Sequence, residues 1–292
     1  MSVAARLAGF AAILALVFGG AAVAGTRIDA DPAAPEPKAA GAPGMGEMAE
    51  AEIAHGGGRG KAAPQAVRGL AVSADGLTLE LARATVRPGE RFDLAFRIAD
   101  RRGRTVRAFD VEHTKRMHVI VVRRDMTGFQ HLHPVQRADG TWSVPATLRD
   151  PGTYRVFADF SAGGRTTTLA GDLTADGTVR SRALPAPASV ADAGDGLRVR
   201  LAAGTTHAGE EADLRFTVTR GGRPVAVEDY LGAKGHLVAL REGDLAFLHV
   251  HPDERRLRFM AELPTAGRYR LFLQFKSGGR VHTAAFTRDV SR

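Results

Sequence analysis

The chain contains no cysteine in its 292 residues. This absence excludes disulfides, zinc fingers and other thiolate metal sites, cysteine nucleophiles and the lipid-bearing cysteine of a bacterial lipoprotein. Aromatic residues are also scarce, at 6% of the chain with a single Trp. The formal charge of +8 comes from scattered arginines rather than from a basic run interleaved with aromatics, so we expect no nucleic-acid partner. The same charge makes an anionic membrane surface a candidate partner.

Motifs typical of hydrolases are missing as well. Neither the G-x-S-x-G nucleophile elbow nor the H-E-x-x-H metalloprotease motif occurs. A histidine-bound metal with an open position can activate water, but no general base can be assigned from the sequence. We therefore expect a protein that is not an enzyme.

The N-terminus has the pattern of an export signal. Arg6 precedes an uncharged stretch over residues 7–25 that is rich in Ala, Leu, Val and Phe, and Ala22-Val23-Ala24 offers an A-x-A cleavage site. The stretch also has about the 20 apolar residues that span a bilayer. We expect residues 1–25 to be either a signal peptide or a membrane anchor. In both cases the body of the protein lies outside the cytoplasm, secreted or anchored through residues 7–25.

Residues 26–66 are rich in Ala, Pro and Gly. Such a composition cannot bury enough apolar surface to fold, so it predicts a disordered tether. The segment contains Met45, Met48 and His55. Thioether and imidazole groups can hold Cu(I), but we interpret the segment as a low-complexity linker.

The rest of the chain is an internal duplication. Residues 75–98 and 195–218 are identical at eleven of twenty-four positions without a gap. Further matches follow at offsets of 118 and then 115, as small loop deletions would produce, and Tyr154-Arg155 aligns with Tyr269-Arg270. We therefore predict a first repeat over residues 67–180, a linker over 181–188 and a second repeat over 189–292.

Each repeat shows the pattern of successive short strands. Residues 77–81 and 92–98 alternate apolar with polar side chains, and residues 119–122 are continuously apolar, as in a central sandwich strand. Turn sequences such as Arg87-Pro88-Gly89 separate the strands, and no long amphipathic helix follows the N-terminus. About seven strands in about 100 residues indicate an all-β fold of two tandem immunoglobulin-like β-sandwiches.

Both repeats carry a lone histidine followed thirteen positions later by an H-x-H-P motif. Six of the ten histidines belong to these two triplets. The members are His118, His131 and His133 in the first repeat, and His236, His249 and His251 in the second. Because imidazole is the commonest protein metal ligand, the repeated triplet makes all six residues candidate metal ligands.

A β-hairpin can bring each triplet together. Residues two apart on a strand share a face, and a turn returns the chain beside the lone histidine. In the second repeat, a turn at Glu242-Gly243 would set His236 opposite His249, with Cβ atoms about 4.5–5.5 Å apart. Three nitrogens plus water suit Cu(II) or Zn(II), and the Irving–Williams order favours copper. We predict one divalent ion per repeat, copper or alternatively zinc.

The triplets also have a structural interpretation. Histidines on a sheet can pack or hydrogen-bond to backbone carbonyls, and a duplicated turn would keep them without a metal. The chain would then be a metal-free immunoglobulin-like interaction or envelope scaffold module. His113 is either a fourth ligand of the first site or a loop residue. Asp125 and Asp244 fall at the hairpin turns, where we interpret them as turn formers, with orientation of the imidazoles as the alternative.

Several segments resemble known exported proteins. Residues 117–125, the sequence His131-Leu132-His133-Pro134, residues 154–160 and residues 230–241 resemble an uncharacterised family of exported, membrane-anchored actinobacterial proteins with tandem H-x-H-P repeats. This resemblance covers nearly the whole chain after the tether. More loosely, the chain looks like the CopC and YtkA-like copper-handling modules, which implies copper sequestration, sensing or delivery at the cell surface. It departs from them in lacking an M-x-x-H-x-x-M stretch and an N-terminal histidine after the cleavage site.

Overall fold

The computed structural model describes residues 67–248, 250–253 and 255–292, and of His251 it describes only the backbone. The expected signal or anchor over residues 1–25 and the expected tether over 26–66 lie outside the described residues. Every regular element in the described part of the chain is a β-strand. Within those residues no helix has the length and apolar character needed to cross a bilayer.

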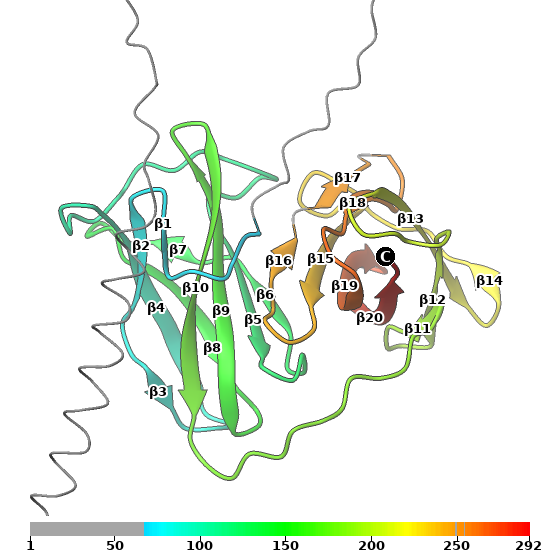
Figure 1. Cartoon of the computed structure of the whole chain (residues 1–292), viewed down its shortest axis with the longest axis horizontal. Helices are drawn as coiled ribbons and strands as arrows, with labels where there is room; N and C mark the ends of the chain where they lie inside the picture. Colours follow the sequence, from blue (N-terminus) through cyan, green and yellow to red (C-terminus); the bar gives the residue numbers. More distant parts are fainter. Residues whose placement is uncertain (1–66, 249, 254) are drawn as a thin grey trace, which may run out of the picture. The chain divides into compact units, whose positions relative to one another are not determined.

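The first repeat is built from two sheets (Figure 1). One sheet has the order β1 (Ser73–Ala74), β2 (Leu77–Leu81), β4 (Arg91–Asp100), β8 (Trp142–Thr147) and β7 (Val135–Gln136). The other has the order β3 (Thr85–Val86), β10 (Arg165–Ala175), β9 (Gly152–Ala162), β5 (His118–Arg123) and β6 (Gln130–Leu132). Strand β3 pairs with β10 in parallel, and β10 pairs with β9 antiparallel along its whole length.

The second repeat has the same plan. One sheet has the order β11 (Val190–Asp192), β12 (Leu197–Ala202), β13 (Glu211–Arg220), β18 (Arg258–Glu262) and β17 (Val250–Pro252), with β14 (Arg223–Pro224) also paired to β13. The other has the order β16 (Phe247–Leu248), β15 (Gly235–Arg241), β19 (Gly267–Ser277) and β20 (Arg280–Val290). The all-β prediction of two tandem immunoglobulin-like sandwiches is confirmed.

The alternating strands bury one face each. On β12, Leu197, Val199 and Leu201 enter the core of the second repeat, while Arg198 and Arg200 are exposed. This alternation follows from the two-residue period of a strand, which sends successive side chains to opposite faces. Each sandwich has its own apolar core of this kind.

Strand β5 is different, because both of its faces are buried. Val119 and Val121 point into the core of the first repeat. Ile120 and Val122 point the other way, into a third apolar cluster that also contains Val238 of β15 in the second repeat. The continuously apolar sequence of residues 119–122 therefore reflects a contact between the repeats as well as a central strand.

A buried tyrosine closes the same corner in both repeats. The hydroxyl of Tyr154 donates to the carbonyl oxygen of Asp150, and that of Tyr269 donates to the carbonyl of Thr265, both at 2.9 Å. Both tyrosines are almost completely buried. A tyrosine near the start of a late strand that bonds the backbone a few residues upstream is a hallmark of immunoglobulin-like sandwiches.

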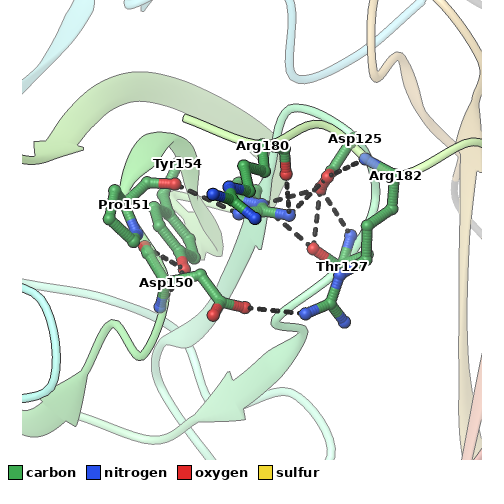
Figure 2. Close-up of polar contacts among 8 residues, drawn as sticks. Asp125, Thr127, Asp150, Pro151, Tyr154, Arg180 and Arg182 are labelled. Atoms are coloured by element: carbon green, nitrogen blue, oxygen red, sulfur yellow. Dashed lines mark hydrogen bonds and ion pairs between the residues drawn. The ribbon is translucent and has the colours of Figure 1, made fainter. Parts of the chain in front are cut away.

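Hydrogen bonds to Asp125 hold the hairpin between β5 and β6 (Figure 2). The guanidinium of Arg123 donates to both carboxylate oxygens of Asp125 at 2.9 and 2.5 Å, and the hydroxyl of Thr127 donates to the same carboxylate at 2.7 Å. Arg123 also donates to the carbonyl of Pro151, which ties the turn to the tyrosine corner. Asp125 is thus a turn former, as interpreted from the sequence.

The second repeat has a matching pair, but its hairpin is longer than predicted. Arg241 donates to both carboxylate oxygens of Asp244, which also accepts from the backbone nitrogen of Ala246 at 3.0 Å. With these bonds the turn occupies residues 242–245, and Ala239 pairs with Leu248. The predicted two-residue turn would have paired Ala239 with Ala246, so the register that set His236 opposite His249 is wrong.

Candidate metal centre

The β5–β6 hairpin places the first histidine triplet on one face of its sheet. Ile120 pairs directly with His131, and paired residues of antiparallel strands point to the same side. His118 lies two residues before Ile120 and therefore shares that side. His133 follows immediately after β6. The structure thus brings together His118, His131 and His133, as the spacing predicted.

The three rings are separated as ligands of one ion would be. The ring centres of His118 and His131 are 5.3 Å apart, those of His118 and His133 are 5.1 Å apart, and those of His131 and His133 are 4.7 Å apart. Imidazoles bound tetrahedrally at metal–nitrogen distances of about 2.0–2.1 Å have ring centres about 5 Å apart. One nitrogen from each ring lies within 4.8 Å of the others.

In His118 and His131, one ring nitrogen faces away from the triplet and donates a hydrogen bond. This outer nitrogen determines which nitrogen of each ring faces the other members of the triplet. Nε2 of His118 donates to the carbonyl oxygen of Glu112 at 3.2 Å. Nδ1 of His131 donates to Oε1 of Gln274 at 2.8 Å, and Gln274 in turn donates to the hydroxyl of Thr283. Metal-binding histidines almost always donate their second ring N–H in this way. The remaining nitrogens, Nδ1 of His118 and Nε2 of His131, face each other at 3.1 Å.

The rings are neutral at ordinary pH because they are removed from water. Burial lowers the pKa of His118, lowers that of His131 well below its usual value, and lowers that of His133 to about 4. With their outer nitrogens donating, neutral His118 and His131 direct lone pairs at one another. Nε2 of His133 is buried and finds no hydrogen-bond partner among the described residues. A cation bound at these nitrogens would satisfy all three rings.

A carboxylate lies beside the triplet. Asp159 pairs with His118 across β5 and β9 and accepts a hydrogen bond from Thr168 at 2.6 Å. Burial raises the pKa of Asp159 to about 6. A cavity of about 70 Å³ lies next to these groups, and its polar lining consists of Glu112, His113, His118, His131, Asp159 and His236. It has room for a small ion or water.

The second triplet is only partly described. Nε2 of His236 donates to the carbonyl of Tyr230 at 3.0 Å, which repeats the bond from His118 to Glu112, and burial lowers the pKa of His236 to about 4. His249 lies outside the described residues. The backbone of His251 belongs to β17, which pairs with β18 in the sheet that does not contain β15. A metal site formed by His236, His249 and His251 stays a prediction.

Sequence reasoning missed the groups that orient the imidazoles. Gln274 and the carbonyl of Glu112 do so, whereas Asp125 and Asp244 bind arginines. One signal was present in the repeat alignment, because Gln274 and Asp159 occupy equivalent positions opposite the two lone histidines.

His113 lies on the turn before β5. The sequence left it as either a fourth ligand of the first site or a loop residue. The structure places it on the turn from Glu112 to Lys115, with its ring centre 6.4 Å from that of His118. It is exposed and it lines the cavity, so it lies on a loop at the edge of the cluster, and its role as a fourth ligand stays a prediction.

Comparison with solved structures gives matches of low identity. The chain is similar to the Escherichia coli adhesin FdeC, at 14% identity and a TM-score of 0.27, over 76% of this chain and 66% of that chain. It is also similar to Salmonella alpha-2-macroglobulin reacted with methylamine, at 14% identity and a TM-score of 0.28, over 78% of this chain and 15% of that one. For the FN1–FN3 domains of chicken CNTN1 the identity is 10% and the TM-score 0.22, over 72% of this chain and 69% of that one. The chain therefore spans less than two thirds of the first two of these proteins.

No curated protein matches the sequence. A family of domains does match, once in each repeat, over residues 71–177 and 189–292. These two segments make up most of the chain, so the protein belongs to the family described as Domain of unknown function (DUF8832).

Proposed function

We propose that this protein binds a divalent metal ion outside the cytoplasm, through His118, His131 and His133. The observation that carries the proposal is the pair of facing nitrogens, Nδ1 of His118 and Nε2 of His131, 3.1 Å apart. Both rings already donate through their other nitrogen, so the facing atoms have lone pairs and no proton to share. A metal ion can accept both of these lone pairs, with the two nitrogens as its ligands.

The donor set favours copper or zinc. Three imidazoles and no sulfur suit Cu(II) and Zn(II), and they serve Cu(I) less well. Copper binds more tightly than zinc to a given set of nitrogen ligands, so Cu(II) is the ion we propose where free copper is present. The role we propose is sequestration, sensing or delivery of this ion at the cell surface.

The proposed location rests on the N-terminal sequence. Arg6, the apolar residues 7–25 and the Ala22-Val23-Ala24 site are the features of an exported chain, cleaved or anchored. The net charge of +8 would favour a position near anionic lipid.

A metal-free interaction or scaffold module is the competing function, and one observation favours it. The outer nitrogens of His118 and His131 hold the Glu112 turn and reach Gln274 of the second repeat, so both rings also have a structural role. A structural role leaves the facing lone pairs and the buried Nε2 of His133 without an explanation.

Metal titration of the full chain separates the two functions. We expect the wild type to bind Cu(II) or Zn(II) tightly in calorimetric titration, and a His131→Ala/His133→Ala variant to lose this site. His207, which bonds Ser291 away from the triplet, gives the matched control His207→Ala. Electron paramagnetic resonance of the Cu(II) form should show several equivalent nitrogen ligands in wild type and control. Equal uptake with equal affinity by the double variant would refute metal binding at this triplet.

A further inference from the structure

We infer that His236 of the second repeat is the fourth ligand of the ion held by His118, His131 and His133, so that the ion links the two repeats. This inference rests on the proposed metal binding and extends it. It replaces one ion per repeat with a single site that both repeats complete.

Strand periodicity directs both lone histidines toward the same contact. His118 shares a face of β5 with Ile120 and Val122, and those two side chains belong to the apolar cluster formed by both repeats. His236 shares a face of β15 with Val238 and Leu240, which belong to the same cluster. Each lone histidine therefore lies at the end of the apolar stripe with which its repeat contacts the other.

Gln274 shows how close the second repeat comes to the triplet. It pairs directly with His236 across β15 and β19, so both side chains point to one side of that sheet. Gln274 reaches Nδ1 of His131 at 2.8 Å. The ring centre of His236 lies 6.0 Å from that of His131 and 6.3 Å from that of His118.

The free nitrogen of His236 is the one a metal would need. Its Nε2 donates to the carbonyl of Tyr230, just as Nε2 of His118 donates to Glu112, and Nδ1 is left as the acceptor. Ligands of one tetrahedral ion have ring centres about 5 Å apart, so His236 has to approach by about 1 Å. The cavity lined by both rings provides the space for this movement.

The apolar contact between the repeats holds His236 close to the triplet. Phe129, on the hairpin that carries the triplet, stacks on Phe272 of β19 with ring centres 4.1 Å apart and planes inclined by 6°. Phe157 packs against Phe247 at 5.4 Å in the same cluster. An ion bound by four imidazoles has no open coordination position, which is typical of structural metal sites.

His113 is the other candidate for the fourth position. Its ring lies 6.4 Å from His118 and 5.5 Å from His236, on an exposed turn. His236 approaches two members of the triplet and is half-buried, so the geometry favours it over His113.

Co(II) bound to the full chain tests this assignment, because four-coordinate tetrahedral Co(II) absorbs visible light much more strongly than five- or six-coordinate Co(II). We expect the wild type to show the intense tetrahedral spectrum. His236→Ala leaves three imidazoles and water on the ion, so the position and intensity of the bands should change and the Co(II) Kd should rise at least ~10-fold, whereas His113→Ala and His207→Ala should change neither. Circular dichroism of each variant confirms that it is folded.

Other outcomes overturn the inference. If His236→Ala keeps the wild-type spectrum and Kd while His131→Ala/His133→Ala loses binding, the proposed function stands and the inference fails. If His113→Ala produces the effects expected of His236→Ala, His113 is the fourth ligand and the inference fails. If His249→Ala/His251→Ala produces them, His236 binds an ion together with the second triplet, and the inference fails as well. If no variant alters Co(II) binding, the proposed function itself fails.

Discussion

Nδ1 of His131 in the first repeat lies 2.8 Å from Oε1 of Gln274 in the second, 143 positions later in the chain. This bond decides which nitrogen of His131 faces His118. A side chain of the second repeat therefore orients the candidate metal centre of the first. Substitutions in either repeat should change the metal affinity of this site.

Removing the amide of Gln274 should weaken metal binding without removing a ligand. In Gln274→Ala the ring of His131 loses its hydrogen-bond acceptor and can turn or change tautomer. We expect the Kd for Zn(II) to rise about 10–100-fold, measured by competition with a chromophoric chelator. Gln274→Glu keeps an acceptor at this position and should retain most of the affinity. Equal Kd values for wild type and Gln274→Ala would show that this bond does not orient a ligand.

The stacked pair Phe129 and Phe272 should couple the stabilities of the two repeats. A double-mutant cycle with Phe129→Ala and Phe272→Ala should give a coupling energy of about 0.5–1.5 kcal/mol in calorimetric unfolding, because the rings stack at 4.1 Å. Phe92 belongs to the other sheet of the first repeat, so a cycle of Phe92→Ala with Phe272→Ala should give a coupling near zero. A coupling near zero for Phe129 as well would mean that the repeats do not dock through this pair.

Each tyrosine corner should contribute a similar amount to stability. Tyr154→Phe and Tyr269→Phe each remove one hydroxyl that donates to a backbone carbonyl at 2.9 Å. We expect each change to lower the free energy of unfolding by about 1–2 kcal/mol in urea denaturation. Tyr230→Phe changes a tyrosine outside the corners and should alter it by less than about 0.5 kcal/mol. A large effect in only one repeat would contradict equivalent roles.

The hairpin carboxylate of Asp125 should make stability depend on acid pH. Burial alone would raise the pKa of Asp125, but the bonds from Arg123 and Thr127 outweigh it and lower this pKa to about 2. Because the pKa in the unfolded chain is about 3.9, the stabilisation is present above about pH 4 and is lost as the pH falls toward 2. The loss amounts to about 2.5 kcal/mol for this difference in pKa.

Urea denaturation at several pH values checks this expectation. The difference in unfolding free energy between wild type and Asp125→Asn should be largest above about pH 4 and should shrink as the pH falls to about 2. Asp176→Asn removes one charge at an exposed position and serves as the control. A difference between wild type and Asp125→Asn that stays constant from pH 5 to pH 2 would contradict the role of this carboxylate.

Periodicity was sufficient to predict the strands and the convergence of the first triplet. Alternation every two residues marks the buried face of strands such as β12, and the duplication carries one sandwich plan into both repeats. The spacing from His118 to the H-x-H-P motif predicted a hairpin, and a hairpin can place three nearby side chains on one face because the contacts are local.

The turn length in the second repeat was less accessible from local patterns. Asp244 binds both the side chain of Arg241 and the backbone nitrogen of Ala246, and this pair of bonds selects a four-residue turn over the expected two-residue turn. A Glu-Gly sequence is compatible with either length, so side-chain bonds at the turn decided the register.

The sequence alone determined two all-β repeats and a histidine triplet on a hairpin, because strand alternation and turn spacing are local properties of the chain. Only the tertiary structure decided what the hairpin faces. It put the outer faces of β5 and β15 into one apolar cluster, Gln274 against His131, and His236 near His118. Contacts between residues more than a hundred positions apart depend on how two folded surfaces pack, and no local spacing records that packing.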